Sequence, residues 1–508
     1  MEKRKNISAY ILIYFAIACC LLVANHHQII SPPLEAGDLA ANSLLVQKAK
    51  SLQLLVGNYS RVGINHPGPA ILYVLAAGEA VFYDGLHVVP FPVSGQFVAA
   101  TFFNAFWITC LTMLFYRLYQ SKRLAVLNLS VFLLMTAFIL PGFFHSIWFP
   151  HLYYFPFATA LLASVFLAKG DKNAFVILAV SSGFLINGHA CFTLILFIIY
   201  ATSLLYNYYC STGDGSAKIL DREFLLKNKR TMIISAAIFS LFLVPIIMNT
   251  AINFPGEFRG YLNFERRHDI NNFLDAVIYV SSFWGGLWPM AAGLLMSLFL
   301  FIKREKLPGV LSGIQYFPVV IFAATLALLC YALFGVDMLA MNYTGYFYYA
   351  APVLFVCAFA GAVVLLIQSE RLRTLSALLS IFFFAACFHI LYKEPPAEPQ
   401  LSEKYLADIY DAVHNRKGTG RIVLDLDSNA DHWEYLWCTM VGLENYAKRR
   451  GDDFICVNDN WHILFTREAR CTPVEVQQNK RYLVKGVNVK DSSAPEFSVD
   501  KMSFYRIK

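Results

Sequence analysis

The sequence predicts an α-helical polytopic membrane protein of about eleven transmembrane helices with a C-terminal extracytoplasmic α/β domain. Three observations lead to this fold class. Of the 508 residues, 57% are hydrophobic and only 15% are charged, which is too apolar for a soluble protein of this size. Apolar runs recur along the chain as far as Tyr392. From Lys393 onward, after the proline-rich segment 394–399, charged residues become frequent.

The predicted helices are the apolar runs long enough, or nearly long enough, to cross about 30 Å of hydrocarbon. The run at 174–186 is short and is expected to pair tightly with the next one around Asn187, Gly188 and His189. The predicted spans are 7–24, 94–116, 124–140, 152–167, 174–186, 191–208, 231–248, 283–301, 316–334, 345–367 and 375–392.

Basic residues collect on alternate loops, which indicates the orientation of the chain by the positive-inside rule. One side receives Lys3, Arg4, Lys5, Arg117, Lys122, Arg123, Lys169, Lys172, the loop 218–230, Lys303, Arg304, Lys306, Arg371 and Arg373. The other receives Lys48, Lys50, Arg61, Arg259, Arg266 and Arg267 before the tail begins. We therefore expect a multi-pass protein of the cytoplasmic (inner) membrane, with its N-terminus cytoplasmic and its C-terminal domain extracytoplasmic.

The segment between the first two spans, residues 25–93, is the long polar part of the N-terminal half and is predicted to form the first outer loop. Residues 39–56 have the pattern of an amphipathic helix that lies in the membrane interface. Residues 70–82 are apolar but too short to cross, and counting them as a span would place the basic loop 117–123 outside. We predict a second interfacial helix there.

Residues 1–393 are thus expected to form the membrane domain, and residues 394–508 a small α/β domain. In the latter, the predicted helices are 402–415 and 432–449, and the predicted strands are 421–425, 454–457 and 463–465. Three of the eleven cysteines, Cys438, Cys456 and Cys471, lie in this tail. A single disulfide can form among them, and their spacing leaves the pair open.

Several function classes are excluded by composition and motif. The net charge of +7 is scattered over short loops and does not form the basic face that binds nucleic acid. The chain contains no P-loop, no glycine-rich dinucleotide motif and no His-Cys metal spacing. Asp425-Leu426-Asp427 matches the D-x-D of soluble sugar-nucleotide enzymes, but acids that end a strand at a turn are ordinary. We therefore predict no metal-ligating residues.

Glu35 and Asp38 are the candidate catalytic acids, because they follow the first span directly and are expected at the edge of the bilayer. A carboxylate near a surface of low dielectric constant can have its pKa raised toward the range of a general base. Their spacing of three puts both on one face if the segment is helical. The alternative is that Asp38 only caps the following helix.

An acidic first loop with interfacial helices, about a dozen spans and an outer α/β domain resembles the C-type (GT-C) membrane glycosyltransferases. This architectural resemblance covers nearly the whole chain. The segments Tyr59-Ser60-Arg61, 65–69, 147–150 and 187–189 also resemble those of a group of bacterial membrane proteins usually placed near that superfamily. It implies a sugar donor linked to a polyprenyl phosphate. It also implies that Asp38 is the catalytic base and that Glu35 is its partner. The family often has adjacent acids, whereas two residues separate them here.

Cations facing the donor phosphate are implied by the same resemblance, because the leaving group is an anion. Arg61 and His66 rank first, since they share the loop with the acids; Asn65, His145 and His189 are expected to contact substrate. Each cation has the alternative role of an interfacial anchor. The remaining outer cations are His151, Arg259, Arg266 and Arg267, which are further candidates for the phosphate, and His268.

We thus predict an inverting hexosyl- or pentosyltransferase that moves a sugar from a polyprenyl-phosphate donor to a cell-envelope glycan or lipid on the outer face of the cytoplasmic membrane. A transporter or flippase of a lipid-linked saccharide is the alternative, and a third is an envelope assembly protein with a binding tail. A flippase predicts ionisable groups in mid-span and inverted repeats, neither of which stands out in the sequence. The sugar, the acceptor, a divalent-metal requirement and the oligomeric state stay open.

Overall fold

The computed structural model describes residues 2–60, 62–210, 218–303, 314–366, 370–393, 403–416, 420–427, 433–458, 469–486, 494–499 and 501–507. Of residues 2–7, 265–267, 370–373, 403 and 433 it describes the backbone alone. The chain divides into two compact units. The bundle unit comprises 1–26, 97–254 and 262–394, and the loop-and-tail unit comprises 27–96, 255–261 and 395–508.

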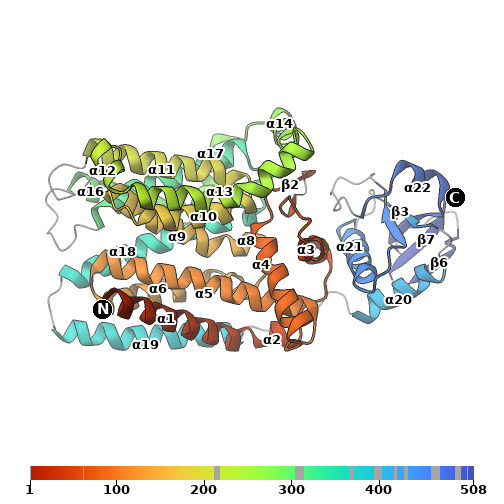
Figure 1. The fold of residues 1–508 in the computed structure, drawn as a ribbon, viewed down its shortest axis with the longest axis horizontal. Coiled ribbons are helices and arrows are strands. Elements are labelled where there is room, and N and C mark those ends of the chain that lie inside the picture. The colour runs from red at the N-terminus through yellow and green to blue at the C-terminus, as the bar shows by residue number, and fades with distance from the viewer. Residues whose placement is uncertain are drawn as a thin grey trace. The chain divides into compact units, whose positions relative to one another are not determined.

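Long apolar helices that run side by side make up the bundle unit (Figure 1). α6 packs against α18 and α19, α9 against α10, α11 and α18, α10 against α13, and α11 against α17. The helices here are α1 (Glu2–Ala24), α5 (Pro92–Tyr119), α6 (Lys122–Ile139), α7 (Gly142–His145), α8 (Phe149–Leu152), α9 (Tyr154–Lys169), α10 (Ala174–Gly188), α11 (Cys191–Cys210), α12 (Arg222–Lys227), α13 (Lys229–Ile252), α15 (Phe273–Ser282), α16 (Leu287–Ile302), η4 (Ile314–Tyr316), α17 (Phe317–Phe334), η5 (Asn342–Tyr349), α18 (Ala350–Leu366) and α19 (Glu370–Lys393).

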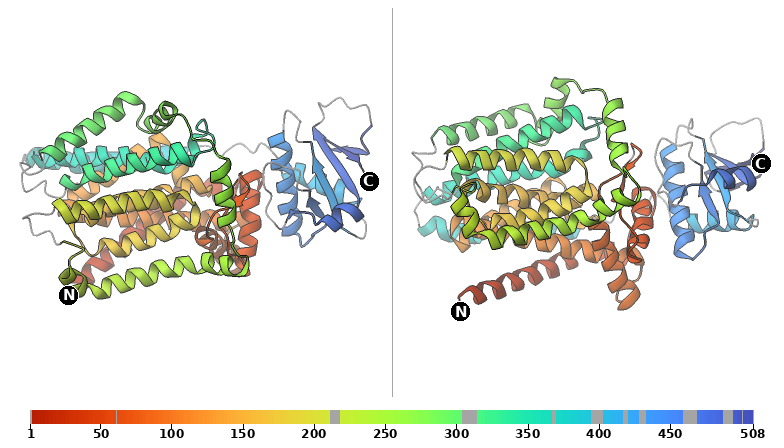
Figure 2. Two further views of the ribbon diagram at one scale, coloured as in Figure 1. Left: turned by 90° about the horizontal axis from the view of Figure 1, so that it is seen from above. Right: turned by 45° about the horizontal axis from the view of Figure 1, so that its top comes forward.

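Burial separates inner from outer helices in this unit. The span from Phe149 to Lys169 is almost wholly buried in the protein, whereas the apolar side chains of α13 are half-buried or exposed. An apolar helix with little protein cover is what a lipid-facing helix requires. Figure 2 shows α13 along the margin of the helix layer, in agreement with its exposure.

Each predicted span corresponds to a helix among the described residues. Within the described part of the chain, eight helices are long and apolar enough to cross a membrane singly, and α15 with α16 forms a ninth candidate bent by 82°. The other two predicted spans are shorter apolar helices, Ser8–Ala24 and Ala174–Gly188. The predicted span 283–301 missed α15, because Gly285 and Gly286 adopt positive φ values and break the helix there.

The loop-and-tail unit contains the short elements α2 (His26–Ile30), α3 (Gly37–Lys50), β1 (Tyr59–Ser60), β2 (Ile64–Asn65), α4 (Ala70–Gly78) and the π-helix η1 (Glu79–Gly85). β1 and β2 form a small hairpin. α14 (Phe258–Arg267) begins in this unit. Both loop helices were predicted, but α3 ends at Lys50, six residues early, and its apolar side chains are buried against α4 and α21. Within this unit, the hydrophobic face of α3 therefore covers protein.

The described residues of the tail form a five-stranded mixed sheet in the order β4-β3-β5-β7-β6. β3 pairs parallel with β4 and β5, and β7 pairs antiparallel with β5 and β6. All five residues of β3 are buried, as expected for a strand covered on both faces. The tail elements are α20 (Glu403–His414), β3 (Ile422–Leu426), α21 (Trp433–Arg449), β4 (Ile455–Val457), α22 (Pro473–Gln478), β5 (Arg481–Gly486), β6 (Phe497–Val499) and β7 (Met502–Arg506).

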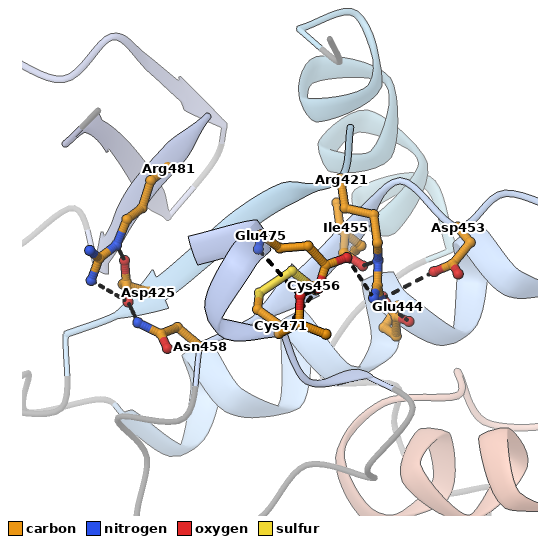
Figure 3. Close-up of a disulfide and its surroundings, with 11 residues drawn as sticks. Arg421, Asp425, Glu444, Asp453, Ile455, Cys456, Asn458, Cys471, Glu475 and Arg481 are labelled. Atoms are coloured by element: carbon orange, nitrogen blue, oxygen red, sulfur yellow. Dashed lines mark hydrogen bonds and ion pairs between the residues drawn. A yellow bond between two sulfur atoms is a disulfide. The ribbon is translucent and has the colours of Figure 1, made fainter. Parts of the chain in front are cut away.

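The first two helices and first two strands of the tail match the prediction within one residue, and the predicted strand 463–465 lies outside the described residues. Cys456 and Cys471 form the disulfide, and Cys438 keeps a free thiol. Figure 3 shows this disulfide beside Arg421, which faces Glu444, Asp453 and Glu475 at 3.8, 3.2 and 3.5 Å. Ion pairs and the disulfide thus fix the end of β4 to the start of α22.

Candidate functional site

Asp38 lies in the first turn of α3, where a carboxylate interacts favourably with the helix dipole. The helix begins at Gly37, whose φ of 51° favours glycine, and Ala36 is its N-cap residue. Asp38 is therefore not the cap. The hydroxyl of Tyr59 in β1 donates a hydrogen bond to the half-buried Asp38 carboxylate.

Two side chains of α21 border this turn. The ring of Trp437 lies 5.9 Å from that of Tyr59. A Cβ atom added at Gly37 would meet the sulfur of Cys438 at 2.8 Å. Burial, together with the negative charges of Asp38 and Glu434, raises the pKa of the Cys438 thiol to about 11, so this thiol is protonated at neutral pH.

Glu35 precedes α3 and takes a different partner. Its Oε1 atom lies 2.8 Å from Nε of Arg449, and its Oε2 atom accepts from Nη2 at 2.8 Å. Asn445 Nδ2 also donates to Oε2, at 3.0 Å. The condition under which both acids would share one helical face is not met, because α3 begins at Gly37, after Glu35.

The guanidinium of Arg449 also binds Glu79, the first residue of η1, through Nη1 at 3.2 Å and Nη2 at 3.3 Å. Glu79 is 1% exposed and accepts from Lys50 at 3.0 Å and from Gln96 at 2.9 Å. Burial favours a higher pKa for Glu79, but the charge of Arg449 outweighs it and the pKa is lowered. Glu35, Glu79, Arg449 and Lys50 form a cluster, which we call the ionic cluster.

The β1–β2 hairpin holds the next predicted residues. The N–H of Asn65 donates to Glu257 at 3.1 Å, its side chain donates to Gly57 O at 3.1 Å, and its carbonyl accepts from Tyr261 at 2.7 Å. His66 is buried, with a relative exposure of 6% for the residue. Asn65 therefore fixes the hairpin to the start of α14.

The predicted cations of this region differ in exposure. Arg259, on α14, is exposed. Arg266 and Arg267 lie on the same helix, but their side chains are outside the described part of the chain, as is the whole of Arg61. His268 follows this helix, and its ring stacks on Phe264 at 5.2 Å.

In the bundle unit, His145 belongs to a buried hydrogen-bond network. Its Nδ1 atom lies 3.0 Å from Oδ1 of Asn25, which follows α1. Asn25 is 1% exposed and donates to Thr101 at 3.1 Å and to Phe144 O at 3.0 Å. Because the amide nitrogen of Asn25 donates both bonds, its oxygen accepts from His145, which places the imidazole proton on Nδ1.

His151 and His189 lie among aromatic rings. His151 stacks on Tyr346 with centroids 5.8 Å apart, and Trp148 meets its edge at 5.2 Å. His189 lies 6.4 Å from Tyr153, and burial lowers its pKa to about 4. His189 is therefore neutral at physiological pH and offers hydrogen bonds without a charge.

Sequence reasoning missed Tyr59, Glu79 and Arg449 as individual residues. Glu79 was visible as a lone acid within an apolar run, a pattern typical of a buried, paired carboxylate. Arg449 stands between Lys448 and Arg450, where a basic helix end is ordinary. Its partners come from the first loop, so no local pattern indicates them.

Asp425 of the D-x-D sequence is buried, and its carboxylate is bound by side chains of the tail. Asn458 donates to it at 2.7 Å and Arg481 binds it through two nitrogens, as Figure 3 shows. Lys485 lies 3.9 Å from Asp427. Within the described ranges no group of three or more His, Cys, Asp or Glu side chains is arranged to hold a metal ion.

No protein-family profile and no curated protein sequence matches the chain. Among solved structures, the crystal structure of ArnT from Cupriavidus metallidurans bound to undecaprenyl phosphate superimposes with a TM-score of 0.55 over 98% of both chains at 11% identity. The apo structure of the same protein gives 0.46 at 12% identity, covering 95% of this chain and 94% of that one. The Archaeoglobus fulgidus oligosaccharyltransferase gives 0.43 at 13% identity, covering 85% of this chain and 61% of that one. The chain therefore has the same fold as this ArnT structure, and the predicted fold class of membrane helices followed by a C-terminal α/β region is confirmed.

Proposed function

We propose that this protein transfers a sugar from a polyprenyl-phosphate donor to a cell-envelope glycan or lipid. The observation that carries the proposal is the fold shared over 98% of both chains with ArnT, whose crystal structure contains undecaprenyl phosphate. The position of Asp38 supports it further. This carboxylate is half-buried, lies in a first helical turn and receives a tyrosine hydroxyl, so it has a fixed position.

In the proposed reaction Asp38 accepts the proton of the acceptor hydroxyl while that oxygen attacks the anomeric carbon. The bond between the anomeric carbon and the phosphate oxygen breaks, and its electron pair leaves with the polyprenyl phosphate. Attack opposite the leaving group inverts the configuration. The sugar, a hexose or a pentose, is not specified by the fold.

Cationic side chains are required for the departing phosphate. Arg61, His66, Arg259, Arg266, Arg267 and His151 are the proposed donors. Arg259 is exposed and reachable from solvent, whereas His66 is buried. Asn65, His145 and His189 are the proposed substrate contacts, although each already has structural hydrogen bonds or ring contacts.

We place the reaction on the outer face of the cytoplasmic membrane, with the tail extracytoplasmic. The alternation of basic loops supports this orientation. The Cys456–Cys471 disulfide supports it independently, because such bonds persist in oxidising compartments and are rare in the cytoplasm.

Purified protein mixed with radiolabelled polyprenyl-phosphate hexoses and pentoses and with membrane-lipid acceptors tests the proposal. We expect a labelled acceptor and free polyprenyl phosphate to appear together. Asp38→Asn should lower the rate by a factor of at least about 100, because it removes the base and keeps the shape. Glu35→Gln should lower it less.

The matched control is Asp452→Asn in the tail, because Asp452 also receives a tyrosine hydroxyl, that of Tyr410. Its rate should equal that of the unaltered protein. An Asp38→Asn variant that transfers sugar normally would remove the catalytic role of Asp38. Movement of an intact donor across vesicles without any product would favour the flippase interpretation.

A further inference from the structure

One face of α21 is shaped to receive the segment that carries Glu35 and Asp38. Cys438, Gly442, Asn445 and Arg449 follow one another at intervals of four, three and four residues, so they form a single stripe along the helix. The opposite side of α21 packs on β3 and β5 of the tail sheet. The stripe therefore belongs to a helix that packs on the tail sheet.

Each member of the stripe meets the segment ahead of α3 or α3 itself. Cys438 lies against Gly37. A Cβ atom added at Gly442 would come within 3.1 Å of Glu35 O and 3.5 Å of Ala36 Cα, so the backbones approach closely there. Asn445 donates to Glu35 and accepts from Gln47 of α3 at 2.8 Å.

Arg449 completes the stripe with two forked ion pairs. One fork binds both oxygens of Glu35, before α3, and the other binds both oxygens of Glu79. Glu79 in turn binds Lys50, the last residue of α3. The planar guanidinium thus fixes the entry of α3 directly and its end through Glu79, which a lysine cannot reproduce.

Asp38 lies within one turn of Glu35, Ala36 and Gly37, the residues that Arg449, Asn445, Gly442 and Cys438 contact. We propose that Arg449, together with the α21 stripe, positions the turn that carries Asp38, so that the tail takes part in building the catalytic site. This inference rests on the proposed function, in which Asp38 is the base. Arg449 acts through Glu35 and α3 and is a positioning residue.

Kinetics of Arg449→Met and Arg449→Lys test the proposal, with Arg450→Met as control. Arg450 carries the same charge, is exposed and lies over the Tyr446 ring at 3.5 Å. We expect Arg449→Met to lower kcat about 10- to 100-fold with the donor KM nearly unchanged, since small misplacements of a reacting group have effects of that size. Arg449→Lys should recover part of the loss, and Arg450→Met should leave kcat unchanged.

Gly442→Ala distinguishes a displacement of the Glu35 segment from a loss of protein stability. Alanine favours the helix more than glycine does, but its Cβ atom must displace the backbone at Glu35 by a few tenths of an ångström. We expect kcat to fall by roughly two- to tenfold, because small displacements of a reacting group lower the rate. The melting temperature should be no lower than that of the unaltered protein. An unchanged kcat in both Gly442→Ala and Arg449→Met overturns the proposal.

The double variant Asp38→Asn with Arg449→Met gives the second readout. A positioning residue has nothing left to position without Asp38, so the double variant should equal Asp38→Asn alone. Losses that multiply would show a general structural role and overturn the inference.

Hydrogen exchange of the amides at 37–42 gives a readout that needs no activity. It should accelerate in Arg449→Met and stay unchanged in Arg450→Met. Equal exchange in all variants overturns the inference. If the unaltered protein transfers no sugar while exchange responds as expected, the proposed function fails and the contact itself remains.

Discussion

The two units differ in the partners that their buried polar side chains bind. In the loop-and-tail unit the buried groups include full charges, and the ionic cluster surrounds the 1%-exposed Glu79 with Arg449 and Lys50. In the bundle unit, His145 and Thr101 are both hydrogen-bonded to the neutral side chain of Asn25. Charges are expensive in hydrocarbon, and neutral hydrogen bonds satisfy helices there. The proposed base Asp38 accordingly lies in the unit whose buried groups include charges.

The sharpest way to break this comparison is Glu79→Ala. It removes the 1%-exposed carboxylate that pairs with Arg449 and Lys50. Because Arg449 keeps Glu35 and Lys50 keeps Asp84, we expect a loss of about 3 kcal/mol, the lower end of the cost of breaking a buried ion pair. Thermal unfolding of the full-length protein in detergent measures the loss. Asp84→Ala is the matched control, because Asp84 pairs with the same Lys50 but is 43% exposed, so its removal should cost about 1 kcal/mol or less. Equal losses in both variants would show that burial does not distinguish them.

The neutral network should respond less strongly. Asn25→Ala removes the partner of His145 and of Thr101, and we expect a loss of about 1 to 3 kcal/mol in the stability of the bundle unit. Asn253→Ala is the control, since Asn253 is exposed and binds only its neighbour Asn249 among the contacts described for it. A loss for Asn25→Ala as large as that for Glu79→Ala would remove the distinction between charged and neutral networks.

The smallest expected effect is a dependence on pH at Glu444. Burial raises the pKa of Glu444 to about 7, and Lys448 and Arg421 only partly oppose it. Because the unfolded carboxyl loses its proton near its usual pKa, the unfolded state binds fewer protons between about pH 4.5 and 7, and stability falls as pH rises through that window. Glu444→Gln should remove this slope and stabilise the protein at pH 7.5 by about 1 to 2 kcal/mol.

Thermal unfolding of the two proteins at pH 5 and pH 7.5 tests this expectation. The pKa of Glu475 is shifted in the opposite direction. Burial would raise it, but hydrogen bonds to Thr472 and the charge of Arg421 outweigh burial and lower it. Its stabilising contribution is present above the usual pKa of glutamate and is lost as pH falls through the lowered one. An unchanged slope in Glu444→Gln would contradict the assignment to Glu444.

The membrane helices could be predicted from sequence because lipid imposes a length and a composition on each one. The same signal failed at α15, since Gly285 and Gly286 bend the path without altering its hydropathy. The last strands of the tail were also missed. On β5, buried residues such as Tyr482 and Val484 alternate with more exposed ones, but this pattern extends over only a few residues and is too short to indicate a strand.

For the site, the sequence identified Glu35 and Asp38 as acids beside the first span but did not indicate that their surroundings differ. That difference depends on Arg449 and Tyr59, and the bond from Arg449 to Glu35 joins residues 414 positions apart. Ion pairs of that range leave no periodicity or spacing in the chain. Whether Arg61 faces the phosphate stays a prediction, because this residue lies outside the described part of the structure.

The double-sided packing of α21 has a consequence for protein engineering. One side of this helix completes the tail sheet and the other covers α3, so a chimera that exchanges residues 395–508 alone would graft a foreign surface onto the native Glu35 segment. The exchangeable module is instead discontinuous and includes residues 27–96 with the tail. Substitutions at Cys438, Gly442, Asn445 or Arg449 during evolution are accordingly expected to be accompanied by compensating changes some 400 positions earlier in the chain, as the separation of 410 residues between Asn445 and Glu35 requires.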